Sequence, residues 1–166
     1  MTQFEQLLSE MNADQAVILP FFAAFSRFEF ALKQSGYAIG EDSVSANWDR
    51  FAADLDANFD RKRTVTLAEA VDYLIKHPPK KQARKGGVLI WVASPAGNAR
   101  ELANLLIYVR RLRNNLFHGG KYPGLVVDDP GRDTTLLRHG LTILDECLTL
   151  CDQHSPKVSD AFYGRE

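Results

Sequence analysis

The sequence predicts an all-α protein that folds as a single bundle of about five helices. Apolar residues recur at helical spacing in five long segments, and polar caps, glycines or prolines mark the ends of most of them. Only residues 88–92 are short and apolar throughout, and periodicity does not decide whether they form a strand or a buried helical turn. At 166 residues, of which 45% are hydrophobic, the chain is long enough to bury one core.

The first long helix is predicted over residues 15–35. Asp14 is a suitable N-cap because its carboxylate accepts a free backbone N–H, and Gly36 is a suitable C-terminal stop. Pro20 either kinks this helix or marks its true start. The face predicted to be buried carries Phe21, Phe25, Phe28 and Leu32.

Two shorter helices are predicted next. The first covers residues 46–60, and the second begins at Thr66, where Glu69 completes a capping box, and ends at Pro78. Residues 80–87 then form a predicted basic loop that ends in glycine. The apolar faces of the two helices carry Trp48, Phe51, Leu55 and Phe59, and Leu67, Val71, Leu74 and Ile75.

The strongest helical pattern covers residues 98–118. Asn98 is its predicted cap, Glu101 completes a capping box, and the pair Gly119 and Gly120 ends the helix. The predicted apolar stripe of this helix carries Leu102, Leu105, Leu106, Val109, Leu112 and Leu116.

The last predicted helix is capped by Asp133, reaches about His154 and ends at Pro156. We therefore expect one domain over residues 1–155 and a frayed C-terminal tail over residues 156–166. The inward face of this helix carries Leu137, Leu141, Leu144, Leu148 and Cys151.

Composition and charge exclude several classes of protein. A formal net charge of -1 argues against a globally basic nucleic-acid coat protein, although it permits a local basic patch. The N-terminus lacks the cationic start and apolar run of a signal peptide, and no apolar stretch approaches the ~18–20 residues that span a bilayer. Two cysteines are too few for a disulfide scaffold. We expect a soluble cytoplasmic protein without membrane contact.

The sequence indicates no metal site and no cofactor. Cys147, Cys151 and His154 recur at helical spacing, but a structural zinc site needs a fourth ligand and none is evident. Phosphate-binding loops, dinucleotide-binding glycine patterns and the serine-hydrolase elbow are all missing from the sequence. Buried core cysteines are the simpler interpretation.

A cation interrupts the apolar stripe of the predicted helix over residues 98–118. Arg113 falls near the middle of the stripe, and such breaks of pattern are most common at functional sites. Asn114 and His118 are four residues apart and share a neighbouring face. The end of the helix therefore presents a guanidinium, an amide and an imidazole. The helix dipole favours a charged imidazole there, whereas Arg113 opposes it.

The pattern Arg113-Asn114-x-x-x-His118 resembles the motif of the HEPN superfamily, in which an arginine and an adjacent polar residue precede a histidine late in a long helix. The segments 28–33 and 116–121 also resemble small bacterial HEPN proteins. The resemblance implies a small helical bundle, a symmetric dimer whose two motifs face one cleft, and metal-independent endoribonuclease activity. It further implies a toxin–antitoxin or phage-defence role, with an antitoxin protein as a possible partner.

The chemistry of the three residues agrees with RNA cleavage through the 2′-hydroxyl. His118 is the expected acid or base, Arg113 the expected clamp on the phosphate oxygens, and Asn114 a residue that orients the phosphate or the other protomer. Two other interpretations stay open. One is a non-catalytic HEPN-like module that binds RNA, a nucleotide or a partner protein, and the other is a structural helical adaptor.

Further residues are expected to support this site. Glu29 lies at the edge of an apolar stripe and is expected to orient Arg113, although an ordinary surface pair with Lys33 is the alternative. Arg110 and Lys121 flank the motif and are assigned as supporting residues. Phosphate contacts and base stacking are assigned to Lys80, Lys81, Arg84, Lys85 and Tyr122.

Overall fold

The protein is described by a computed structural model that covers residues 2–11, 13–98, 100–117 and 130–165. Within these residues the chain forms seven α-helices and two small antiparallel sheets. The fold is therefore mainly helical, as predicted, but it is not the expected all-α bundle of about five helices. The helices are α1 (Gln3–Ser9), α2 (Gln15–Gln34), α3 (Trp48–Leu55), α4 (Val65–Lys76), α5 (Glu101–Phe117), α6 (Pro130–His154) and α7 (Pro156–Tyr163). A 3₁₀ turn (Asp56–Asn58) extends α3, and the strands are β1 (Ala38–Ile39), β2 (Ser45–Ala46), β3 (Lys81–Lys85) and β4 (Val88–Val92).

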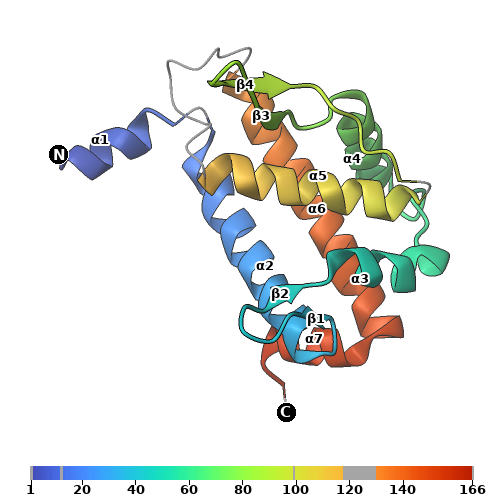
Figure 1. Ribbon diagram of the computed structural model, residues 1–166. Helices are drawn as coiled ribbons and strands as arrows, with labels where there is room; N and C mark the ends of the chain where they lie inside the picture. Colours follow the sequence, from blue (N-terminus) through green and yellow to red (C-terminus); the bar gives the residue numbers. More distant parts are fainter. Residues whose placement is uncertain (1, 12, 99, 118–129, 166) are drawn as a thin grey trace.

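Helix α6 is the central element of the bundle. It packs against α2, α4 and α5, and α5 crosses it as shown in Figure 1. Helix α3 packs against α5, whereas α1 projects away from the body of the molecule. The largest fully buried side chains come from α2, α3, α4, α5 and α6, and they include Phe21, Phe28, Phe51, Leu67, Leu74, Leu105, Leu112 and Leu136.

Helix α2 matches its prediction closely. Asp14 Oδ1 accepts the N–H of Ala16 at 2.9 Å, and Gly36 follows the helix with a φ of +91°, a conformation that favours glycine. Pro20 lies inside the helix. The predicted stripe of Phe21, Phe25, Phe28 and Leu32 is buried.

Helix α2 also departs from one expectation. With a mean hydropathy of 1.3 over an 18-residue window, it is the helix within the described ranges that is long and apolar enough to cross a membrane. A third of that window is buried inside the bundle, where α2 contacts α6 and α7. Length and composition of this kind are shared by core helices of globular proteins.

Several predicted helix starts are displaced. Thr64, rather than Thr66, caps α4, since its hydroxyl accepts the N–H of Leu67 at 3.1 Å. The Asn98 side chain accepts the N–H of Arg100 at 3.0 Å, and α5 begins one residue later. Helix α6 begins at Pro130, ahead of the predicted cap Asp133, because proline is well suited to the first turn of a helix.

The predicted basic loop over residues 80–87 is wrong, and residues 88–92 are a strand. Strands β3 and β4 form a hairpin in which Lys81 pairs with Val92 and Lys85 with Val88. Gly86 and Gly87 connect them with φ angles of +56° and +84°. A two-residue turn with two positive φ angles matches the twist of a hairpin, and glycine adopts it without strain.

The expected frayed tail is also wrong for residues 156–163, which form α7. Val158 is fully buried, and the ring of Phe162 lies 4.9 Å from the ring of Phe28. Arg27 of α2 donates hydrogen bonds to the carbonyl groups of Ala161 and Phe162. Pro156 therefore begins a helix rather than ending the fold, and the packed unit extends beyond residue 155.

Gly140 of α6 lies close to side chains of α2 and α5. A Cβ atom at this position comes within 2.9 Å of Leu112 Cδ1 and 3.0 Å of Phe21 Cε2, both on fully buried side chains. We expect Gly140→Leu to lower the free energy of unfolding by about 1–3 kcal/mol, in spite of the higher helix propensity of leucine, because the core is overpacked. Chemical denaturation measures this change. Gly97→Ala, at a position with no neighbour within 4 Å, is the control, and unchanged stability of Gly140→Leu contradicts the close crossing.

Candidate active site

Helix α5 carries three faces with different roles. The core face is the predicted stripe, of which Leu102, Leu105, Leu106, Val109 and Leu112 are buried and Leu116 is half-buried. A second face, with residues spaced three or four apart, contains Arg110, Arg113, Asn114 and Phe117. A third face contains Tyr108, Arg111 and Asn115. Because the core face is fixed by packing, the directions of the other two faces are fixed as well.

Arg113 lies at the edge of the core and not in the middle of its apolar stripe. The guanidinium is half-buried, with its central carbon 4.5 Å from the ring centre of Phe117 and 5.8 Å from that of Phe25. Its Nη1 atom donates a hydrogen bond to Asn114 Oδ1 at 3.1 Å. Aromatic faces attract a cation without occupying its N–H groups. The arrangement therefore holds the guanidinium in place and leaves other donors for a ligand.

The charge of Arg113 is not neutralised by an ion pair within the described residues. No carboxylate of those residues lies within 4.0 Å of its guanidinium, whereas Arg110, one turn earlier, forms an ion pair with Asp49 at 2.7 Å. The predicted supporting residue Arg110 thus lies on the same face, and its charge is neutralised by Asp49 in the first turn of α3.

The predicted contact between Glu29 and Arg113 is replaced by a different one. Glu29 Oε1 accepts a hydrogen bond from Trp48 Nε1 at 3.2 Å. The Trp48 side chain is buried, and a buried indole N–H needs an acceptor, which the half-buried carboxylate supplies. Glu29 therefore joins α2 to the start of α3. The proposed surface pair with Lys33 is likewise not among the ion pairs of the described residues.

Three residues assigned from the sequence lie outside the described residues, namely His118, Lys121 and Tyr122. The imidazole of the motif therefore stays a prediction from the sequence, in which it directly follows the last residue of α5. The structure places the other two motif residues, Arg113 and Asn114, together.

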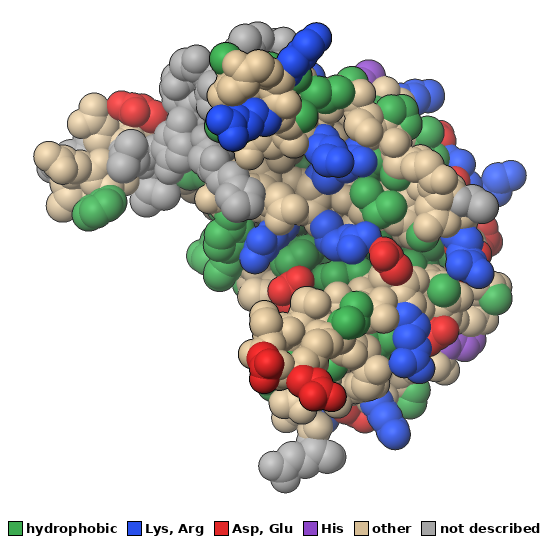
Figure 2. All heavy atoms as spheres, viewed as in Figure 1, with side chains coloured by type: hydrophobic (Ala, Val, Ile, Leu, Met, Phe, Trp, Pro, Cys, Tyr) green, Lys and Arg blue, Asp and Glu red, His purple; other side chains and the backbone are tan. Residues whose placement is uncertain are grey.

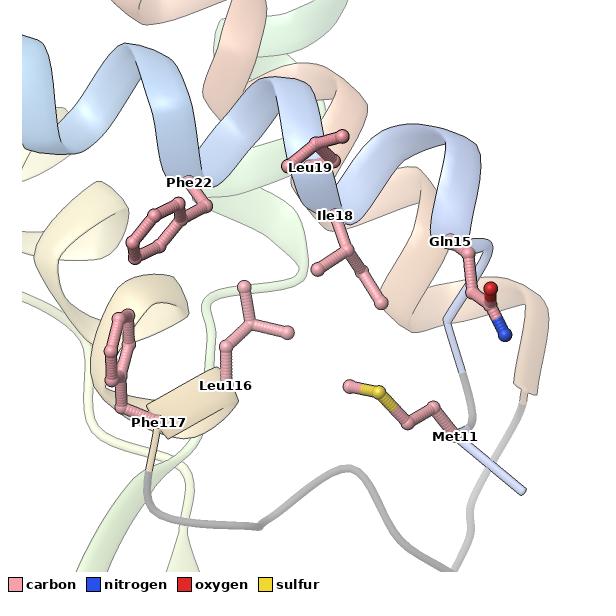
Figure 3. Close-up of a pocket in the computed structure, with 7 residues that line it drawn as sticks. All are labelled: Met11, Gln15, Ile18, Leu19, Phe22, Leu116 and Phe117. Atoms are coloured by element: carbon pink, nitrogen blue, oxygen red, sulfur yellow. The ribbon is translucent and has the colours of Figure 1, made fainter. Parts of the chain in front are cut away.

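An apolar groove that the sequence did not predict lies beside Arg113. It has a volume of about 580 Å³ and is bounded by the first half of α2, the end of α5 and Met11. In Figure 3 the side chains of these segments turn toward one another, and the rings of Phe22 and Phe117 are 5.5 Å apart. Leu19 is also exposed at its edge. The residues that line the groove are Met11, Gln15, Ile18, Leu19, Phe22, Leu116 and Phe117.

The third face of α5 holds the β3–β4 hairpin. Asn115 Nδ2 donates to the carbonyl of Lys80 at 3.0 Å, and Arg111 donates to the carbonyl of Ser94. The hydroxyl of Tyr108 accepts the N–H of Ala96 at 3.0 Å. Burial lowers the pKa of the Arg111 guanidinium below its ordinary value. Both ends of the hairpin are therefore tied to one side of the helix that carries the motif.

The predicted phosphate-binding cations are distributed over this hairpin. Lys81, Arg84 and Lys85 are exposed on β3, whereas Lys80 is half-buried at its base. Figure 2 shows Lys and Arg side chains over the hairpin and again along α5 on the same face of the molecule, with acidic side chains beside the second group. The sequence analysis assigned these cations to a loop, whereas Lys81, Arg84 and Lys85 lie on a strand.

A second basic cluster, residues 61–63, has a structural role. Arg61 forms ion pairs with Asp72 and Glu101, so Glu101 is a salt-bridge partner and not half of a capping box. Arg63 binds the carboxylate of Glu146, which is only 2% exposed, and these hydrogen bonds raise the pKa of Arg63. A buried carboxylate needs such a partner. These arginines therefore connect the region before α4 to α5 and α6.

The cysteines are core residues. Burial raises the pKa of the Cys147 thiol well above its ordinary value and that of Cys151 to about 12, so neither is a thiolate near neutral pH. Across the described ranges, no three His, Cys, Asp or Glu side chains are grouped closely enough to hold a metal ion.

The anchoring of the hairpin can be tested at Asn115, whose side chain is buried. We expect Asn115→Leu to leave the Lys80 carbonyl without its donor and to lower stability by about 1–3 kcal/mol. Hydrogen–deuterium exchange should show faster exchange of residues 81–92 and unchanged exchange in α2. Asn114→Leu, on the exposed neighbouring position, is the matched control, and equal exchange of the hairpin in both variants contradicts this anchoring role.

Comparisons with protein-family models, curated proteins and solved structures found no match to this chain. The chemistry of the site therefore follows from the arrangement of its own residues.

Proposed function

We propose that the protein is a metal-independent endoribonuclease of the HEPN kind, with a toxin–antitoxin or phage-defence role in the cytoplasm. The observation that supports this proposal most directly is the state of Arg113. Among the described residues its guanidinium is held by two aromatic rings and an amide, and no carboxylate pairs with it. Structural arginines of the described residues use their donors differently: Arg63 binds the carboxylate of Glu146, and Arg27 and Arg111 donate to backbone carbonyl groups. A planar, unneutralised guanidinium at an open face suits a phosphodiester.

In this proposal RNA supplies its own nucleophile. His118 removes the proton of a 2′-hydroxyl, the 2′-oxygen forms a bond to phosphorus, and the bond from phosphorus to the 5′-oxygen breaks. The developing charge on the phosphate oxygens is stabilised by Arg113. A protonated His118 from a second copy donates its proton to the departing 5′-oxygen. The products are a 2′,3′-cyclic phosphate and a 5′-hydroxyl, and each proton has an assigned donor and acceptor.

Asn114 acts as a positioning residue. Its carbonyl oxygen accepts the hydrogen bond from Arg113, which fixes the plane of the guanidinium. Bidentate recognition of a phosphate depends on that plane. Asp49 neutralises Arg110, one turn earlier on α5, and this ion pair does not involve Arg113.

A second copy of the chain is the proposed occupant of the apolar groove. The groove is lined by apolar side chains, with Gln15 as an exception, and Phe117 is shared between it and the cation of the motif. Exposed apolar surface of this kind is characteristic of protein interfaces. A twofold contact at the groove brings two motifs together, which is what a separate acid and base require. An antitoxin protein that covers the same region is the proposed means of silencing the enzyme.

The nuclease proposal is tested by cleavage of labelled single-stranded RNA in excess EDTA. We expect Arg113→Ala and His118→Ala to lower the rate at least about 100-fold, which is the range for loss of one acid–base or charge-stabilising group. The wild type should yield a 2′,3′-cyclic phosphate. Arg100→Ala removes the same charge roughly 20 Å along α5 and is the matched control. Equal cleavage by all preparations, with folding verified by circular dichroism, removes the catalytic assignment.

Loss of cleavage with retained binding has a separate meaning. If no preparation cleaves any of several RNAs while wild-type protein binds them in a salt-dependent manner, the protein is a non-catalytic RNA-binding module.

The dimer proposal is tested at the groove. We expect Leu19→Glu and Phe22→Glu to convert a dimer to a monomer in light scattering and to abolish cleavage, because each variant buries an unpaired charge at the interface. Val65→Glu changes an apolar residue that is 76% exposed on α4 and should leave the dimer intact. If the wild type is a monomer at micromolar concentration, or if both groove variants remain dimers, the groove is not the dimer interface.

A further inference from the structure

The β3–β4 hairpin is unusual in its composition and exposure. Its first strand, Lys81–Lys85, has three exposed cations and no acidic residue, and its second strand, Val88–Val92, is entirely apolar. Leu89 is 57% exposed, Val88 is also exposed, and Trp91 is half-buried. An isolated two-stranded hairpin does not bury such side chains by itself. The apolar strand therefore remains available to a ligand.

The register places aromatic and cationic groups on one face. Gln82 pairs with Trp91 and Arg84 with Leu89, so these four side chains share a face of the hairpin. Arg84 is thus diagonal to Trp91, at the ~7–8 Å separation of diagonal neighbours. The opposite face carries Lys81 and Lys85 with the valines of β4. One face accordingly offers an indole for stacking with a guanidinium beside it, and the two lysine ammonium groups lie on the other face.

We propose that this hairpin is a binding arm for single-stranded RNA. Bases stack on Trp91 and pack against Leu89, and Arg84 contacts the phosphates on that face. The long side chains of Lys81 and Lys85 reach the phosphates from the other face. Stacking of this kind tolerates any base, and cations along the backbone provide affinity without sequence preference. A strand that carries cations and no acidic residue is complementary in charge to a polyanion such as RNA.

The position of the arm connects it to the motif. Asn115, which holds the base of the hairpin, is adjacent in sequence to Asn114, which contacts Arg113. A bound RNA strand that extends from the hairpin therefore needs to cross only α5, whose diameter is about 10 Å, to reach Arg113. Figure 2 shows cations over the hairpin and along α5 on one face of the molecule. This inference rests on the proposed ribonuclease function and names where the substrate is held outside the cleavage site.

The chain contains two tryptophans, and they report on different regions. Trp48 is 2% exposed in the core, whereas Trp91 lies on the hairpin. A 2′-O-methyl oligouridine of twelve nucleotides, which has no free 2′-hydroxyl and is not cleaved, is the probe. We expect it to quench the tryptophan emission of the wild type and of Arg113→Ala, and not that of Trp91→Leu.

Affinity and its salt dependence give a second measurement. We expect Trp91→Leu to weaken binding by about 5- to 150-fold, the effect of losing one stacked base. Arg84→Ala and Lys85→Ala should each reduce the slope of log affinity against log salt by about 0.7. Lys62→Ala, an exposed cation outside the hairpin, is the control. Circular dichroism checks that each variant is folded.

Three results overturn the proposal. The first is unchanged affinity in Trp91→Leu and Arg84→Ala, and the second is an equal loss in Lys62→Ala, which indicates non-specific attraction. The third is a change of oligomeric mass in the hairpin variants without a change in RNA affinity, which makes the hairpin a protein interface. Quenching without cleavage contradicts only the nuclease proposal, and cleavage without quenching contradicts only the binding arm.

Discussion

Burial of one stripe of α5 against α2 and α6 is the constraint on which the rest of the arrangement depends. When the core face of a helix is fixed, the directions of its other side chains are fixed as well, because the helix has 3.6 residues per turn. Tyr108, Arg111 and Asn115 must then face the hairpin, while Arg113 and Asn114 face the open side. The hairpin and the motif are therefore located by the same packing and keep a constant relation to each other.

Four arginines of the chain differ in the way that their guanidinium groups are held. Arg61, Arg63 and Arg110 are neutralised by carboxylates from other elements and hold those elements together. Arg113 is instead positioned by aromatic rings, which fix a guanidinium without removing its ability to bind an anion. Identical side chains thus serve different purposes, and their neighbours decide which.

The sequence was sufficient for the main helices because each buries a stripe with a clear period. The Phe21 to Leu32 stripe of α2 and the leucine stripe of α5 are buried as predicted. Residues 80–92 were harder, since a strand of lysines and arginines lacks the alternation that predicts a sheet, and only the paired glycines indicated a hairpin. The prediction that Pro156 ends the fold is wrong because proline also begins helices.

In the candidate site, only contacts between residues close in sequence could be predicted. Arg113 and Asn114 are neighbours in sequence, so their contact follows from position. The predicted place of Arg113 in the middle of the apolar stripe is wrong, because the side chain lies half-buried at the edge of the core. The partner of Glu29 was not predictable, because Trp48 reaches it through the packing of α3 on α2. The apolar groove combines residues that lie about 100 positions apart, and no local pattern reports such a combination.

The close passage at Gly140 has an evolutionary consequence. The space that a side chain needs at this position is occupied by Leu112 of α5 and Phe21 of α2. A lineage that acquires a larger residue at 140 must reduce one of these two, so the three positions are expected to covary. Leu112 directly precedes Arg113, so a substitution at Gly140 that displaces Leu112 can also displace Arg113. Selection that preserves the position of Arg113 therefore acts on Gly140 as well, although Gly140 has no chemical role.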